Sequence, residues 1–176
     1  HITATTGMDA LTHAVEAFIG KSNTKETKEM AARATQLIVD NLCQAFEKGD
    51  DLFVRQQMQK ASYYAGIAFT RAYVGYVHAI AHSLGAYYNT AHGLANAVIL
   101  PVVLEAYEDA VYDSLNELAL ITNLGCMEQS KKENTQSFIQ WIRNTNNKMG
   151  ISDTLKDLQK EDIPVLVRHA TKEANP

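Results

Sequence analysis

Residues that can bind a metal ion are concentrated in two short segments of this sequence. Residues 7–16 contain Asp9 and His13, and residues 78–93 contain three more of the chain's six histidines. Asp9 and His13 are four residues apart, so a helix places both side chains on one face. One carboxylate with two or three imidazoles is a ligand set for a divalent metal ion, and such an ion can polarise an alcohol or carbonyl oxygen.

The second segment contains a pair of histidines with helical spacing and a third histidine beyond a predicted turn. His78 and His82 are four residues apart. Gly85 then permits a bend, and the Asn-Thr pair at 89–90 supplies residues that favour helix caps. A chain that reverses its direction here can bring His92 back toward His78.

Together these segments offer three imidazoles and one carboxylate, which suit Zn²⁺ in four-coordinate form and also suit Fe²⁺. Each residue also has an ordinary alternative. Asp9, at the predicted opening of the first helix, would favour the positive helix end, and a lone His13 would more often be a hydrogen-bonded core residue. Glu16 either orients one of the ligands from behind or is an ordinary carboxylate on a helix face.

Helical periodicity extends along almost the whole chain, and sustained alternation with a period of two is missing. Residues 23–26 and 130–133 resemble capping boxes, and Gly49 and Gly150 follow the ends of helical patterns. Gly93 would allow a close approach of two backbones. The fold is therefore predicted to be all-α, an irregular multi-helix bundle. The predicted helices after the first cover about 24–48, 51–70, 75–88, 92–106, 111–119, 130–150 and 161–172, with a short turn at 153–158.

Composition narrows the class of protein. The chain has 176 residues, of which 46% are hydrophobic, which is enough for one core and one domain. Its net charge is −4 and its basic residues are scattered, which argues against binding to nucleic acid or to an anionic membrane. The apolar stretches are shorter than the roughly 20 residues of a membrane span, and no secretory signal pattern opens the chain. Cys43 and Cys126 have no Cys-x-x-Cys partner, so we expect a reduced, cytoplasmic location.

The two segments resemble the signatures of the iron-containing (group III) alcohol dehydrogenases. Residues 6–16, Thr-Gly-Met-Asp-Ala-Leu-Thr-His-Ala-Val-Glu, resemble the first signature, and residues 75–101 resemble the second. The helical pattern between and after them fits the family as well. The resemblance implies that the catalytic metal is bound by one aspartate and three histidines, which fall on Asp9, His13, His78 and His92.

The same resemblance implies a role for His82 near the nicotinamide and the substrate, as a proton relay or in positioning the cofactor. The implied reaction is hydride transfer between a small alcohol or aldehyde and NAD or NADP. The metal would act as a Lewis acid on the substrate oxygen, and the cofactor would carry the hydride. Family members are expected to be homodimers or larger assemblies.

One departure from the family is large. Its members have an N-terminal α/β domain that binds the dinucleotide, whereas only eight residues precede Asp9 here and no G-x-G-x-x-G motif is present. The sequence also stops at 174–176, where family members continue. We therefore expect residues 1–176 to be a single helical metal-binding domain, a fragment without the N-terminal domain and the extreme C-terminus, and inactive alone.

Other functions stay open from the sequence. A glycerol-dehydrogenase-like or dehydroquinate-synthase-like enzyme would share the fold but usually carries a different ligand set. A non-catalytic metal-binding helical module is the second alternative, although the motif positions lack the Glu-x-x-His pairs of di-iron bundles. A helical interaction domain without a metal is the third, and it would leave the clustered histidines as a coincidence.

Overall fold

The computed structural model describes residues 1–155 and 158–174, and every regular element within these ranges is a helix. The all-α prediction is confirmed. The α-helices are α1 (Ile2–Ile19), α2 (Lys25–Glu47), α3 (Leu52–Ala72), α4 (Tyr76–Tyr88), α5 (His92–Ala106), α6 (Tyr112–Ile121), α7 (Lys131–Lys148) and α8 (Ile163–Glu173), and the 3₁₀ helices are η1 (Glu108–Val111) and η2 (Lys160–Asp162).

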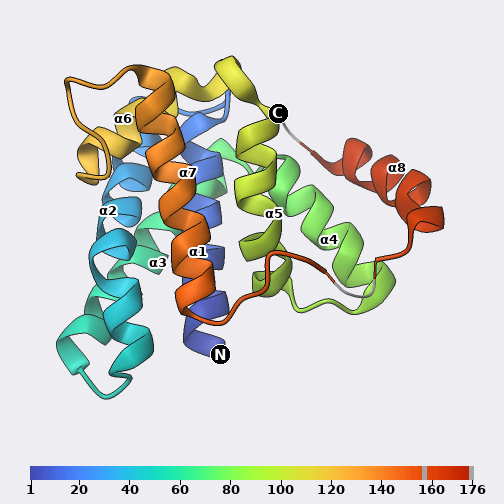
Figure 1. Ribbon diagram of the computed structural model, residues 1–176, viewed down its shortest axis with the longest axis horizontal. Helices are drawn as coiled ribbons and strands as arrows, with labels where there is room; N and C mark the ends of the chain where they lie inside the picture. Colours follow the sequence, from blue (N-terminus) through green and yellow to red (C-terminus); the bar gives the residue numbers. More distant parts are fainter. Residues whose placement is uncertain (156–157, 175–176) are drawn as a thin grey trace.

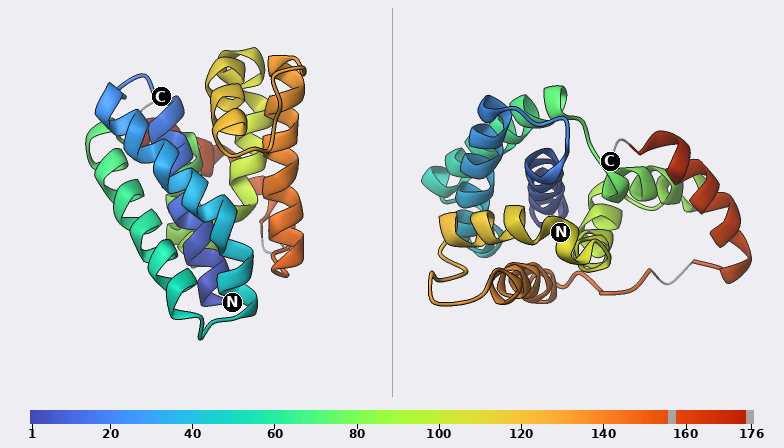
Figure 2. Two further views of the ribbon diagram at one scale, coloured as in Figure 1. Left: turned by 90° about the vertical axis from the view of Figure 1, so that its left-hand side faces the viewer. Right: turned by 90° about the horizontal axis from the view of Figure 1, so that it is seen from above.

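Helix α1 lies at the centre of the bundle (Figure 1). The view from above in Figure 2 shows α2 and α3 on one side of it, α4 and α5 on the other, and α6 and α7 along a third side. Twelve of the 18 residues of α1 are buried, which explains why it carries apolar residues around most of its circumference. Helix α8 packs against α4 at the edge of the bundle. In the described part of the chain, no helix has both the length and the apolar character needed to cross a bilayer.

Helix α5 contains a proline in its interior, and α7 compensates for it. Pro101 has no N–H, so the carbonyl of Ala97 loses its usual partner four residues along the helix. The buried side chain of Asn146 in α7 donates its Nδ2–H to this carbonyl at 2.7 Å. A buried carbonyl without a partner destabilises a fold, so this bond lets α5 continue through the proline.

Two expectations about helix starts are wrong. Helix α1 begins at Ile2, so Asp9 lies in its middle and not at its opening. The charge of Asp9 therefore does not act on the first turn, where the helix dipole is felt. The capping box of α2 is formed by Thr24 and Thr27, and the Asn23 amide instead donates to the Phe18 carbonyl at the end of α1. Thr24 has the extended backbone that a cap requires, with φ −117° and ψ 169°.

The chain reversal between α4 and α5 lies between the predicted helices, without a bend at Gly85. Gly85 stays inside α4, and the helix ends at Asn89, whose φ of 55° and ψ of 30° are left-handed. Asparagine tolerates this conformation better than most residues because its short polar side chain can hydrogen-bond locally. Ala91, not residue 89 or 90, takes the N-cap position of α5, without a side-chain cap.

In the second half of the chain, the observed helix ends agree more closely with the predicted ones. The capping box of Ser130 and Glu133 at the start of α7 is confirmed, as is the stop at Gly150, which has a φ of 72°. The final helix starts at Ile163, after η2, two residues later than expected. The predicted turn at 153–158 includes residues 156–157, and the expected chain end includes 175–176, which lie outside the described residues.

Candidate metal centre

Three helices contribute the polar side chains that meet beside the bundle core. Helix α1 contributes Asp9 and His13, one turn apart. Helix α4 contributes His78 in its first turn, and α5 begins with His92. Because the turn at Asn89 reverses the chain, the N-terminal part of α4 and the start of α5 both face α1.

Asp9, His78 and His92 form the tightest group of possible ligands among the described residues, with ligand atoms all within 4.8 Å of one another. Oδ1 of Asp9 lies 3.7 Å from Nε2 of His78 and 3.1 Å from Nε2 of His92. The expected return of His92 toward His78 is therefore present, with their ring centroids 5.4 Å apart.

His13 lies beside this group but outside the three whose ligand atoms all meet the 4.8 Å spacing. Its ring packs 4.1 Å from the ring of His78 and 4.2 Å from that of Phe69, measured between centroids. Its Nδ1 lies 3.0 Å from the backbone oxygen of Asp9, so Nδ1 carries the hydrogen and Nε2 keeps a free lone pair. Burial is the main cause that lowers the pKa of His13 to about 4, so its ring is neutral near pH 7.

His78 is held from behind by a buried carboxylate. Both His78 and Glu16 are almost fully buried, and Nδ1 of His78 donates to Oε2 of Glu16 at 2.6 Å. The other oxygen of Glu16 accepts the backbone N–H of Val77 at 2.7 Å. Burial lowers the pKa of His78, but the carboxylates of Asp9 and Glu16 outweigh it and raise this pKa to about 9.

The second nitrogen of His78 faces the group of ligands. Nε2 of His78 is buried and has no hydrogen-bond partner. With a pKa of about 9, His78 carries a hydrogen on both ring nitrogens near pH 7. Glu16 keeps the hydrogen on Nδ1, so a metal ion that replaces the hydrogen on Nε2 would meet a lone pair directed toward Asp9 and His92. A buried ring nitrogen without a partner costs stability, and a metal ion that takes the place of its hydrogen would satisfy it. The residues present therefore fit a metal ion.

Asp9 is ionised in this setting, and an asparagine that the motif reasoning missed contacts it. Burial raises the pKa of Asp9, but His78 and His13 beside it and the Asn96 amide lower it overall. Nδ2 of Asn96 donates to Oδ1 of Asp9 at 2.6 Å and lies 3.1 Å from Nε2 of His92. The signal that could have found Asn96 is its spacing, four residues after His92 on one helix face.

Asp9, His13, His78 and His92 are called the cluster below. His82 lies at its exposed edge and is not one of the three residues whose ligand atoms lie within 4.8 Å of one another. Its side chain is 41% exposed, and its ring stacks on that of His92 with a centroid distance of 5.1 Å. Nδ1 of His82 pairs with the carboxylate of Glu173 in α8. The cluster thus has a closed side at His78, whose side chain is 2% exposed, and an open side at His92, at 42%.

Gly93 explains how α5 approaches α1 so closely. A Cβ atom at this position would lie 2.4 Å from the backbone oxygen of Thr5, far inside normal contact distance. Any other residue would push the two helices apart. The expectation of a close backbone approach at Gly93 is therefore confirmed, and it brings His92 next to Asp9.

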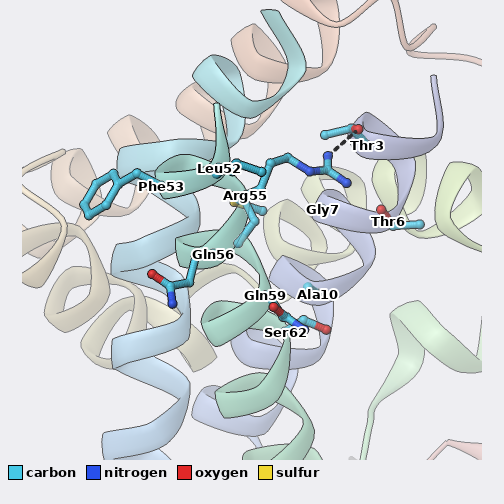
Figure 3. A pocket seen from close by; sticks show the side chains of 11 residues that line it. Thr3, Thr6, Gly7, Ala10, Leu52, Phe53, Arg55, Gln56, Gln59 and Ser62 are labelled. Atoms are coloured by element: carbon cyan, nitrogen blue, oxygen red, sulfur yellow. Dashed lines mark hydrogen bonds between the residues drawn. The ribbon is translucent and has the colours of Figure 1, made fainter. Parts of the chain in front are cut away.

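A separate concave surface lies on another side of α1, between this helix and the first turns of α3 (Figure 3). This α1–α3 groove has a volume of about 820 Å³. None of the cluster residues lines it. Its lining includes Thr3, Thr6, Gly7 and Ala10 of α1 and Leu52, Phe53, Arg55, Gln56, Met58, Gln59 and Ser62 of α3.

Comparison with known proteins identifies the family of this chain. The family model described as Fe-containing alcohol dehydrogenase family, C-terminal, matches residues 3–176. The chain belongs to this family. A 1,3-propanediol dehydrogenase of Klebsiella pneumoniae is 40% identical over 176 residues, which are 99% of this chain and 46% of that protein. Alcohol dehydrogenase 4 of Saccharomyces cerevisiae is 38% identical, over 98% of this chain and 45% of its own length.

Solved structures of iron-type alcohol dehydrogenases share the fold. A 1,3-propanediol oxidoreductase superimposes with a TM-score of 0.94 at 39% identity, over 98% of this chain and 46% of that one. An alcohol dehydrogenase from Oenococcus oeni gives 0.94 at 33% identity with the same coverage. A sulfoacetaldehyde reductase from Bifidobacterium kashiwanohense, solved in complex with NAD⁺, gives 0.85 at 29% identity, over 96% of this chain and 43% of that one. The chain spans about half the length of the curated relatives it matches.

Proposed function

We propose that Asp9, His13, His78 and His92 bind one divalent metal ion, Fe²⁺ or Zn²⁺. The observation that carries this proposal is the buried Nε2 of His78, which has no partner and faces Asp9 and His92 while Glu16 holds the opposite nitrogen. His13 would complete the set through Nε2, since its Nδ1 is engaged by the backbone. Both ions accept this donor set, and Zn²⁺ has the higher intrinsic affinity.

We further propose that the chain is the metal-binding C-terminal part of an NAD- or NADP-dependent alcohol dehydrogenase for small alcohols or aldehydes. Family membership and the names of the relatives support this activity. When bound, the metal supplies Lewis-acid polarisation of the substrate oxygen. The closed side of the cluster excludes water behind His78, and the exposed side at His92 leaves room for substrate to enter.

His82 is the proposed catalytic and cofactor-binding residue of this chain. Its exposed ring stacks on that of His92, and its Nδ1 pairs with the carboxylate of Glu173. In this proposal His82 would pass a proton from the substrate oxygen to solvent or position the nicotinamide of a bound cofactor, and its exposure beside the metal ligand His92 supports that role.

The remaining half of the enzyme is proposed to be a dinucleotide-binding domain like that of the longer relatives, and the active assembly is proposed to be a homodimer or larger. The chain described here would hold the metal half of the active site without the cofactor half. It is therefore expected to lack NAD-dependent alcohol oxidation by itself. Such activity in the purified 176-residue chain would contradict the proposal that a separate domain binds the cofactor.

The first experiment is a measurement of metal content in the purified chain after loading with Fe²⁺ or Zn²⁺. About one ion per chain is expected, and the double variant His78→Ala with His92→Ala is expected to lose it. His169→Ala is the matched control, because His169 is an exposed histidine of α8 outside the cluster. An unaltered chain that binds no metal, or a double variant that binds it as well, would remove the basis of the proposal.

A further inference from the structure

Asn96 is the one buried amide that lies between two of the proposed ligands in the described part of the chain. Its side chain is fully buried in α5, one turn after His92. Nδ2 of Asn96 lies 2.6 Å from Oδ1 of Asp9 and 3.1 Å from Nε2 of His92. A single amide nitrogen thus contacts the atoms through which both residues would bind a metal.

The orientation of this amide follows from the charge of Asp9. A carboxylate only accepts hydrogen bonds, so the amide must turn its N–H toward Asp9 and not its oxygen. The reverse orientation would place two acceptors 2.6 Å apart. A hydrogen bond to an ionised partner is also stronger than a neutral one.

This orientation has a cost at the other end of the side chain. Oδ1 of Asn96 is buried and has no hydrogen-bond partner. A buried polar atom without a partner destabilises the fold, and an apolar residue of similar volume would remove that cost. What offsets this cost is the hydrogen bond that the same amide makes to the carboxylate of Asp9.

We propose that Asn96 is a positioning residue for the metal site. It holds the carboxylate of Asp9 through one N–H, so that a metal ion meets this ligand already in place. The single lone pair of His92 Nε2 is left for the metal, with the amide of Asn96 beside it. The inference rests on the proposed function, since it needs Asp9 and His92 to bind a metal. Fixing ligands in this way before binding is how residues behind a metal site increase its affinity.

Asn146 provides a matched control, because it is a second buried asparagine whose Oδ1 also has no partner. Its Nδ2 donates to the backbone oxygen of Ala97 at 2.7 Å and not to a proposed ligand. A purely structural role for Asn96 would make the two asparagines equivalent in their effect on metal binding. A positioning role separates them.

The experiment measures Zn²⁺ affinity by competition with a chelator, and the visible absorption of bound Co²⁺, in Asn96→Leu and Asn146→Leu. We expect Asn96→Leu to lower Zn²⁺ affinity about 10- to 100-fold and to change the Co²⁺ spectrum. The midpoint of denaturant unfolding of the metal-free variant should fall, because Oδ1 of Asp9 loses its donor. Asn146→Leu should lower that midpoint and leave the metal affinity within about twofold of the unaltered chain's, since Ala97 is not a proposed ligand.

The outcomes separate this inference from the function on which it rests. If Asn96→Leu folds and keeps both the affinity and the spectrum, the positioning role is wrong and the metal site stands. If the unaltered chain binds neither Zn²⁺ nor Co²⁺, both proposals are wrong. If the Asn96→Leu variant does not fold, Asn96→Ala replaces it in the experiment, and the same loss of Zn²⁺ affinity is expected.

Discussion

Helix α1 has the cluster on one side and the α1–α3 groove on another, and the polar residues of the two differ in burial and in their contacts. On one side, Asp9 joins a cluster that extends from the buried His78 to the exposed His92, with its members at hydrogen-bonding or ligand distances from one another. On the other side, the α1–α3 groove is wide and open, and the long side chains of Leu52 and Phe53 at its edge are 83% and 67% exposed. Figure 3 shows Phe53 pointing away from α1.

The difference lies in how the polar atoms are held. In the groove, Arg55 reaches Thr3 at 3.1 Å across exposed surface, an interaction that water can replace at little cost. In the cluster, Glu16 fixes His78 where water does not reach, and the facing nitrogen of His78 lacks a partner. The cluster therefore differs from the groove in the burial of His78 and in the hydrogen bond that fixes it, and the larger volume of the groove does not make it the better candidate site.

The sharpest test of this comparison removes the buried support of the cluster. Glu16→Ala leaves the Nδ1–H of His78 and the backbone N–H of Val77 without acceptors. We expect a loss of metal affinity of about 10- to 100-fold, measured by chelator competition. The metal affinity of Glu16→Gln should lie between those of Glu16→Ala and the unaltered chain, because the glutamine has one side-chain oxygen where the two donors now meet two.

Glu29→Ala is the control for that substitution, since Glu29 is an exposed carboxylate of α2 that pairs with Arg33. It should leave metal affinity unchanged. Equal affinities in the variants at Glu16 and Glu29 would show that burial of the carboxylate does not matter for the cluster.

A second test moves the helices that bring the cluster together. Gly93→Ala introduces a Cβ atom 2.4 Å from the Thr5 carbonyl, which a rigid backbone cannot absorb. We expect a fall of about 1–3 kcal/mol in the free energy of unfolding, measured with urea.

Gly66→Ala is the matched control, because Gly66 lies within α3 and a Cβ there meets nothing within 4 Å. That variant should gain about 1 kcal/mol from helix propensity. A Gly93→Ala chain as stable as the Gly66→Ala chain would mean that the close approach of α5 to α1 is not needed.

The smallest effect is expected in the groove. Arg55→Ala and Thr6→Ala should change the free energy of unfolding by no more than about 0.5 kcal/mol, because both side chains are exposed. Metal affinity should not change. A drop in affinity for either variant would contradict the contrast between the two sides of α1 and would make the groove part of the site.

The sequence predicted most helices and the spacing of the cluster because both depend on local periodicity. Residues four apart share a helix face wherever the helix forms, so His78 and His82 were placed correctly on α4. The start of α1 was misplaced because residues 2–6 contain four β-branched residues with modest helix propensity, and burial of Ala4 and Met8 overrides that preference.

Contacts between helices were harder to predict. Nothing local distinguishes Asn96 from an ordinary polar residue in an apolar helix, since its role depends on Asp9, 87 residues away in the chain. Gly85 permits a bend, but a glycine does not require one, and α4 continues through it. Next to Gly85, Leu84 belongs to a buried cluster with Ala95 of α5 and Leu166 of α8, and this packing favours the continued helix.

The bond between Asn146 and Ala97 makes two distant positions of the sequence interdependent. Replacing Pro101 with alanine would give α5 back an N–H aimed at the Ala97 carbonyl, and the Asn146 amide would then compete for an acceptor that no longer needs it. The cost of changing either residue therefore depends on the identity of the other. We therefore expect positions 101 and 146 to vary together among homologues.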